Sequence, residues 1–163
     1  MIIREEKESD IPPIAHIHNQ AFNSADEARI VEKLRKNNKI TVSLVCESDG
    51  EILGHIAYSP VYSKNEIAGV GLAPVAVLPS VQKQGIGTKL INSGNHIVFS
   101  KGFEKIFVLG DPAYYSRFGF ENAKKYNYFS QFDPEGHNFM ILGKDIRKQI
   151  ERIDIDFCEE FYV

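Results

Sequence analysis

The stretch between residues 75 and 88 reads Val75-Ala76-Val77-Leu78-Pro79-Ser80-Val81-Gln82-Lys83-Gln84-Gly85-Ile86-Gly87-Thr88. Its first part is apolar and typical of a buried strand, and its second part is a glycine-bearing loop that opens a helix. Gly85 and Gly87 let the backbone approach a bound group closely, and the free N–H groups of the first helical turn point at that group. The helix dipole adds about half a positive charge at this end. The stretch therefore predicts a local site for a phosphate or pyrophosphate.

Residue types exclude two common phosphate loops. A Walker A loop requires GxxxxGK[ST], which Gly87-Thr88-Lys89 does not supply, and a GxGxxG loop requires glycine where Leu90 stands. For the loop taken alone, an ordinary strand-to-helix turn that uses glycine for its geometry remains the alternative interpretation.

Hydrophobic periodicity on both sides of the loop predicts a mixed α/β sheet protein. We expect strands near residues 1–4, 41–46, 51–61, 68–78, 105–109, 139–142 and 153–157, and helices near residues 10–22, 24–37 and 87–100. Ser9 and Asp10 can cap the first helix, and Ser24 and Glu27 have the spacing of a capping box at the start of the second helix. Pro74 cannot donate a ladder hydrogen bond, so the strand over 68–78 must be distorted, bulged or unpaired there.

Length and composition limit the classes of protein to which this chain can belong. The chain has 163 residues, 43% of them hydrophobic, and its 19 basic and 22 acidic side chains leave a formal net charge of −3. We expect one domain over residues 1–163. The charge argues against nucleic acid as a partner, and no apolar run suits a membrane span or a signal peptide. We therefore expect a cytoplasmic protein, with the choice between monomer and homodimer open.

Cysteine and histidine spacing predicts no metal site. Cys46 and Cys158 are far apart and lack a CxxC pattern, so they are expected to be reduced and buried. His16 and His18 are two positions apart on a predicted helix and do not share a face. The charged tail from Asp145 onward is expected to be solvated apart from the last strand.

Two motifs carry a family resemblance. Gln82, Gly85 and Gly87 match the [RQ]-x-x-G-x-[GA] pyrophosphate loop, and Tyr115-Ser116-Arg117-Phe118-Gly119-Phe120 matches the Y-x-x-x-G-F, of the GNAT superfamily of acetyl-CoA-dependent acyltransferases. With Gly110-Asp111-Pro112-Ala113-Tyr114 in front, the second motif resembles a bacterial subgroup of predicted N-acetyltransferases. The resemblance is strongest over residues 1–143, with 144–163 as a C-terminal extension. It implies a GNAT-like central mixed sheet flanked by helices and splayed around residues 70–78.

The resemblance also implies roles for individual residues. Backbone groups of Val75, Ala76 and Val77 would pair with the pantetheine arm of acetyl-CoA, and the loop would hold its pyrophosphate through Gln82, Lys83, Gln84, Gly85, Ile86, Gly87 and Thr88. Tyr115 would be the general acid for the leaving thiolate, with Tyr114 as its rival if the register slips by one. The family's asparagine before the tyrosine has no match here, and Asp111 is better explained as a helix cap.

The resemblance implies acetyl transfer from acetyl-CoA to a primary amine of a small molecule or protein by direct attack. Candidate bases are Glu47, His55 and Glu66, with His55 also open to a structural role, and a water relay is a further route. The acceptor is open, although a slightly acidic chain suits a cationic amine. Alternatives are a non-catalytic acyl-CoA binding or sensing module, and a structural protein with an incidental glycine turn.

Overall fold

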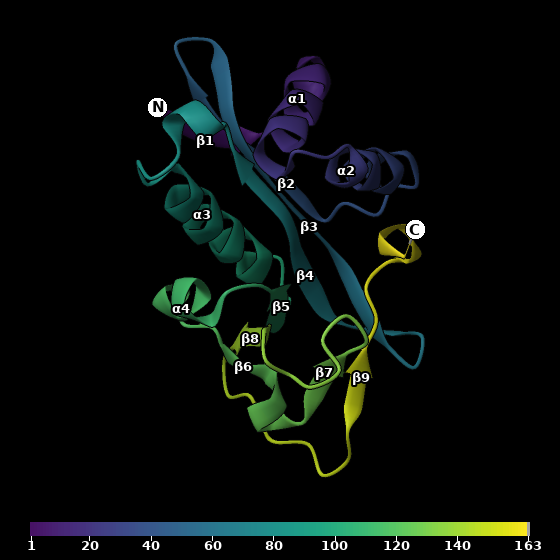
Figure 1. Ribbon diagram of the computed structural model, residues 1–163. Helices are drawn as coiled ribbons and strands as arrows, with labels where there is room; N and C mark the ends of the chain where they lie inside the picture. Colours follow the sequence, from purple (N-terminus) through teal and green to yellow (C-terminus); the bar gives the residue numbers. More distant parts are fainter. Residues whose placement is uncertain (163) are drawn as a thin grey trace.

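A seven-stranded mixed sheet forms the centre of the computed structural model, which describes residues 1–162 (Figure 1). The strand order is β1-β2-β3-β4-β5-β8-β6, in which only β4 and β5 run parallel. The strands are β1 (Ile2–Glu5), β2 (Val42–Ser48), β3 (Glu51–Ser63), β4 (Glu66–Val77), β5 (Lys105–Leu109), β6 (Glu121–Asn122) and β8 (Phe139–Gly143). β7 (Tyr128–Ser130) and β9 (Ile153–Ile155) pair in a separate two-stranded sheet.

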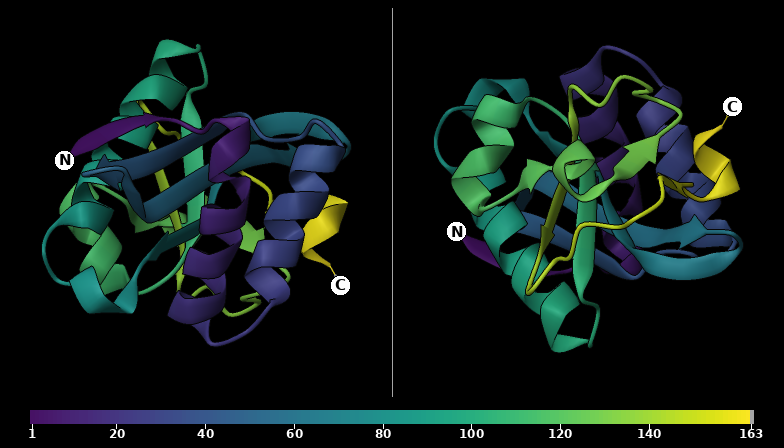
Figure 2. Two further views of the ribbon diagram at one scale, coloured as in Figure 1. Left: turned by 90° about the horizontal axis from the view of Figure 1, so that it is seen from above. Right: turned by 90° about the horizontal axis from the view of Figure 1, so that it is seen from below.

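Helices cover both faces of the sheet, as Figure 2 shows in two further views. The α-helices are α1 (Ile11–Phe22), α2 (Asp26–Lys36), α3 (Ile86–Ser100) and the short α4 (Pro112–Tyr115). Successive residues of a strand point to opposite faces, and on β3 the backbone at Gly54 meets side chains of α3 whereas His55 contacts His18 of α1. α1 and α2 therefore lie on one face and α3 on the other.

The sheet opens between its two parallel central strands. β4 pairs with β5 only at Val70 and Gly71, and beyond them it continues alongside β3 as far as Val77. The register between β3 and β4 shifts opposite Pro74, between Ile56 and Tyr58, and the peptide bond before this proline is cis. The predicted distortion at Pro74 and the splay around residues 70–78 are confirmed.

Two predicted local features differ in the structure. Asp10 precedes α1 but does not cap it, because its carboxylate accepts hydrogen bonds from Arg4 and from the N–H of Lys7. At α2 the predicted capping box does not form: the helix starts at Asp26 with Ala25 as N-cap, and Ser24 Oγ accepts from the Asp26 N–H. At α1 the predicted cap is therefore replaced by tertiary contacts of Asp10. At α2 the predicted capping box is lost because the helix starts one residue later than expected.

The C-terminal segment is less solvated than its charge pattern suggested. After β9, Phe157 and Cys158 are buried, and the short 3-10 helix Glu159–Phe161 lies beside α2 (Figure 1). Glu160 accepts a hydrogen bond from Asn37 Nδ2 at 2.7 Å, which ties this segment to the end of α2. The expectation of a wholly solvated tail outside the last strand was wrong, because its apolar residues close one side of the opened sheet.

Candidate active site

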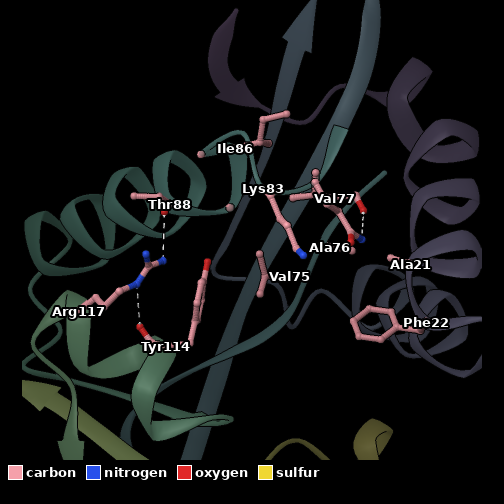
Figure 3. A pocket seen from close by; sticks show the side chains of 13 residues that line it. Ala21, Phe22, Val75, Ala76, Val77, Lys83, Ile86, Thr88, Tyr114 and Arg117 are labelled. Carbon is pink, nitrogen blue, oxygen red and sulfur yellow. Dashed lines mark hydrogen bonds between the residues drawn. The ribbon is translucent and has the colours of Figure 1, made fainter. Parts of the chain in front are cut away.

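A cavity of about 660 Å³ lies where β4 ends and α3 begins (Figure 3). We call it the loop cavity. Its lining contains every residue predicted for the cofactor except Gln84, together with four others. The lining residues are Ala21, Phe22, Val75, Ala76, Val77, Gln82, Lys83, Gly85, Ile86, Gly87, Thr88, Tyr114 and Arg117.

The backbone at the start of α3 presents free hydrogen-bond donors to this cavity. Gly85 is the N-cap, with φ of 84°, a left-handed conformation that favours glycine. The helical ladder begins with the bond from the Lys89 N–H to the Gly85 carbonyl at 3.1 Å. The N–H groups of Ile86, Gly87 and Thr88 consequently have no partner inside the helix. This arrangement suits a phosphate, which accepts from such groups and is favoured by the helix dipole.

Side chains of the loop and of α4 surround the free N–H groups at the start of α3. Gln82 Nε2 donates to the Val77 carbonyl at 3.1 Å, so this side chain fastens the loop to the strand. A Cβ atom at Gly87 would lie 3.0 Å from the Tyr114 hydroxyl, which shows how closely α4 approaches the helix start. Glycine at this position keeps the space in front of the free N–H groups open.

Arg117 is a cavity residue to which the sequence analysis assigned no role. Its guanidinium lies 4.6 Å from the centre of the Tyr114 ring, and Nη2 is 3.5 Å from Thr88 Oγ1. Figure 3 shows Arg117 and Tyr114 on one side of the cavity, Phe22 on the other, and Lys83 extending between them. Arg117 and Lys83 therefore place positive charge beside the free N–H groups. The only sequence signal was the position of Arg117 within the tyrosine motif.

β4 presents an open backbone edge to the loop cavity. Val75, Ala76 and Val77 pair with β3 on one side. On the other side, within residues 1–162, β4 has no strand partner beyond Gly71. An extended ligand can add to such an edge as an extra strand.

A second cavity, of about 290 Å³, lies in the opened sheet behind this edge. We call it the cleft cavity. It shares the lining residues Phe22 and Val75 with the loop cavity, so the two cavities are adjacent there. The lining residues are Phe22, Glu27, Ile30, Leu72, Ala73, Pro74, Val75, Leu109, Tyr115 and Phe161.

Tyr115 belongs to the cleft cavity and Tyr114 to the loop cavity. The Tyr115 side chain packs against Phe118 and Phe120, and a Cβ atom at Gly110 would overlap its ring. Burial raises the pKa of Tyr115 to about 12, so the phenol keeps its proton at neutral pH.

Comparisons with known proteins agree with this geometry. The model of the acetyltransferase (GNAT) family matches residues 7–120. This chain belongs to the GNAT family. It is 39% identical over 125 residues to the uncharacterized N-acetyltransferase YhbS of Escherichia coli K12, which covers 76% of this chain and 75% of YhbS.

Solved GNAT structures resemble the whole of this chain. The crystal structure of YhbS from Escherichia coli in complex with CoA has a TM-score of 0.93 and 32% sequence identity, and the match covers 99% of this chain and 92% of that one. A GNAT family acetyltransferase from Brucella melitensis in complex with acetyl-CoA has a TM-score of 0.83 and 34% identity, with 98% and 97% covered. The GNAT-like mixed α/β fold expected from the sequence is confirmed.

The predicted base candidates of this GNAT chain lie outside both cavities. His55 is fully buried, with Nδ1 at 2.8 Å from His18 Nε2 and Nε2 at 2.8 Å from Ser43 Oγ. Glu47 accepts from Arg4, and Glu66 begins β4 at the hairpin. The catalytic role of His55 stays a prediction, and its hydrogen bonds fit the structural alternative.

Three further observations concern Asp111, the clustering of metal ligands and the length and hydropathy of the helices. Asp111 Oδ1 accepts from the Ala113 N–H at 3.0 Å, so the capping role is confirmed. In the described part of the chain, no three His, Cys, Asp or Glu side chains gather as a metal site would require. None of the helices described between residues 1 and 162 combines the length and the apolar character that crossing a membrane requires.

Proposed function

We propose that this chain transfers an acetyl group from acetyl-CoA to a primary amine of a small molecule or protein by direct attack. The observation that carries the proposal is that Val75, on the open edge of β4, lines both the loop cavity and the cleft cavity. Donor and acceptor can then approach from opposite sides of one strand edge.

The loop cavity supports the donor half of the proposal. The N–H groups of Ile86, Gly87 and Thr88 bind the pyrophosphate, with charge from Lys83 and Arg117 beside them. The edge from Val75 to Val77 pairs with the extended arm and directs the thioester toward the cleft cavity. Acetyl-CoA supplies the activated acetyl group, and the protein supplies position and a proton.

Tyr115 is the catalytic acid in this proposal. The amine nitrogen forms a C–N bond to the acetyl carbon while the C–S bond breaks, and the sulfur takes the phenolic proton of Tyr115. The proton that the nitrogen releases returns to the phenolate through water, so each turnover leaves the enzyme unchanged. Because burial raises the pKa of Tyr115 to about 12, the phenol is in its proton-donating form throughout the neutral range.

A panel of amines incubated with the protein and acetyl-CoA tests this function. Release of free thiol together with a product heavier by one acetyl group supports it. If acetyl-CoA binds but no amine, peptide N-terminus or lysine side chain is acetylated, the chain is an acyl-CoA sensor instead. If CoA neither binds nor shifts the thermal midpoint, both functions are wrong.

A further inference from the structure

Glu27 is the unexpected member of the cleft cavity. It lies in the first turn of α2 and is half-buried as a residue, but its Oε2 atom is fully buried without a hydrogen-bond partner among residues 1–162. The capping box that its spacing with Ser24 suggested does not form, so helix capping does not account for this carboxylate.

Apart from the start of α2, whose helix dipole favours an acidic side chain, the surroundings of Glu27 supply no positive charge. The side chains that line the cavity with it are apolar except for the phenol of Tyr115. No ion pair within the described residues involves Glu27, although its neighbour Asp26 pairs with Arg29 on the exposed side of the helix. A carboxylate oxygen buried without a partner costs free energy, and a cation that enters the cavity removes this cost.

We propose that Glu27 binds the amino group of the acceptor as its ammonium form, and this rests on the acetyl transfer proposed above. Glu27, Val75 and Tyr115 line one cavity, so an amine held by Glu27 lies in the same space as the strand edge and the proposed acid. Loss of one proton to water then gives the nucleophile within the cleft.

The cavity also limits the rest of the acceptor. A volume of about 290 Å³ is at the lower end of the range for small-molecule sites, which begins near 300 Å³. Phe22, Ile30, Leu72 and Phe161 provide apolar and aromatic walls for a short stem. Because Glu27 is the one charged side chain among the described lining residues, we infer a compact monoamine with an apolar body. A free α-amino acid would place a second carboxylate beside Glu27, and a polyamine would bury an uncompensated charge.

A binding and kinetic comparison of three proteins tests the proposal: wild type, Glu27→Gln, and Asp26→Asn as control. Asp26 is in the same helical turn and is exposed, so its substitution removes one charge from the helix start without changing the cavity. The probes are 2-phenylethylamine, butylamine, spermidine and phenylalanine, with 2-phenylethanol as the uncharged analogue. Binding is measured by calorimetry in the presence of CoA, and acetylation by thiol release.

The proposal predicts three results. Glu27→Gln weakens binding of 2-phenylethylamine roughly 30-fold or more, which is the usual range for removing one partner of a desolvated charge pair. Its affinity for acetyl-CoA and for 2-phenylethanol stays within about twofold of wild type, and Asp26→Asn behaves as wild type throughout. The thermal midpoint of Glu27→Gln stays close to that of wild type, because relief of the unpartnered Oε2 charge is offset by loss of an acidic side chain from the first turn of α2.

Other results overturn it. Equal amine affinity in wild type and Glu27→Gln means that the carboxylate turns out to solvent, and a lowered thermal midpoint with unchanged amine binding means that its role is structural. Preference for spermidine or phenylalanine over the monoamines overturns the acceptor class. Glu27→Met, of similar length and without charge, repeats the comparison if Glu27→Gln does not fold. Because binding is measured without turnover, amine binding that depends on Glu27 in a protein that acetylates nothing contradicts the proposed function alone.

Discussion

Tyr114 and Tyr115 are neighbours in the chain, yet their rings line different cavities. The ring centres are 5.0 Å apart and the planes meet at 88°. Adjacent residues of a helical turn point about 100° apart, so α4 directs Tyr114 toward the start of α3 and Tyr115 into the opened sheet. The sequence motif left open whether Tyr114 or Tyr115 is the acid, and the structure places these two candidates in different cavities.

Substitution of each tyrosine by phenylalanine tests which one is the acid. Tyr115→Phe is expected to lower kcat roughly 100-fold while the affinity for acetyl-CoA stays within twofold, because only the transferable proton is lost. Tyr114→Phe is expected to change kcat less than Tyr115→Phe does. Steady-state kinetics with calorimetric CoA binding measure both. The opposite order of kcat effects would assign the acid to Tyr114.

The pH dependence of kcat provides a second check on Tyr115. The phenol donates its proton only while protonated, and burial raises its pKa to about 12. Ionisation of this phenol should therefore cause no loss of kcat up to about pH 10.5. A loss of kcat centred near pH 9 that disappears in Tyr115→Phe would contradict the raised pKa of Tyr115, whereas one that persists in Tyr115→Phe would belong to another group.

Gly87→Ala is expected to weaken CoA binding at least about 10-fold, since the added methyl group occupies the space in front of the free N–H groups. The methyl group would also meet the Tyr114 hydroxyl at 3.0 Å. The double variant Gly87→Ala with Tyr114→Phe removes this contact and should bind CoA no better than Gly87→Ala. Calorimetry measures the affinity and circular dichroism checks the fold. Full recovery in the double variant would show that the tyrosine contact, and not the phosphate space, caused the loss.

Arg117→Gln is expected to reduce affinity for CoA about 10-fold and to leave affinity for pantetheine, which lacks the phosphates, unchanged. The reason is that Arg117 lies beside Thr88 at the helix start and not along the strand edge. Lys101→Gln at the exposed far end of α3 is the matched control. An equal loss of affinity for CoA and for pantetheine would mean that Arg117 acts by packing against Tyr114 and not by binding phosphate.

The buried pair of His18 and His55 predicts a loss of stability in mild acid. Burial lowers the pKa of His18 to about 3 and also lowers that of His55. Histidines of the unfolded chain take up protons near pH 6.5, so unfolding gains protons, and the free energy of unfolding declines as the pH falls below about 6.5. His18 alone contributes a slope of up to about 1.4 kcal/mol per pH unit.

Urea denaturation of wild type and His18→Gln between pH 7.5 and pH 5 measures this slope. The glutamine amide can still donate to His55 Nδ1 but does not titrate, so the variant should lose less stability in acid. His96→Gln, at an exposed histidine of α3, should follow wild type. Identical slopes for wild type and His18→Gln would mean that folding does not lower the pKa of His18.

Several elements of the site were predictable because they depend on neighbours in sequence. The strand, the glycine loop and the helix start between Val75 and Thr88 form through local backbone geometry, and Gly85 at the helix start adopts a left-handed conformation that favours glycine. Pro74 likewise indicated where the strand would depart from regular pairing.

Other elements depended on contacts between segments that are distant in sequence. Local spacing assigned Glu27 to a capping box, but the packing of α2 beside the opened sheet turned it into the cleft cavity. His55, an expected base, was sealed between His18 and Ser43 by the same packing.

The sequence by itself determined the geometry of the loop proposed to bind phosphate, since its glycines and free N–H groups are consecutive in the chain. Only the tertiary structure decided which side chains line the cleft cavity. Glu27, Tyr115 and Phe161 come from three separate segments, and no local pattern specifies how a helix, a turn and the C-terminal segment pack around the gap between β4 and β5.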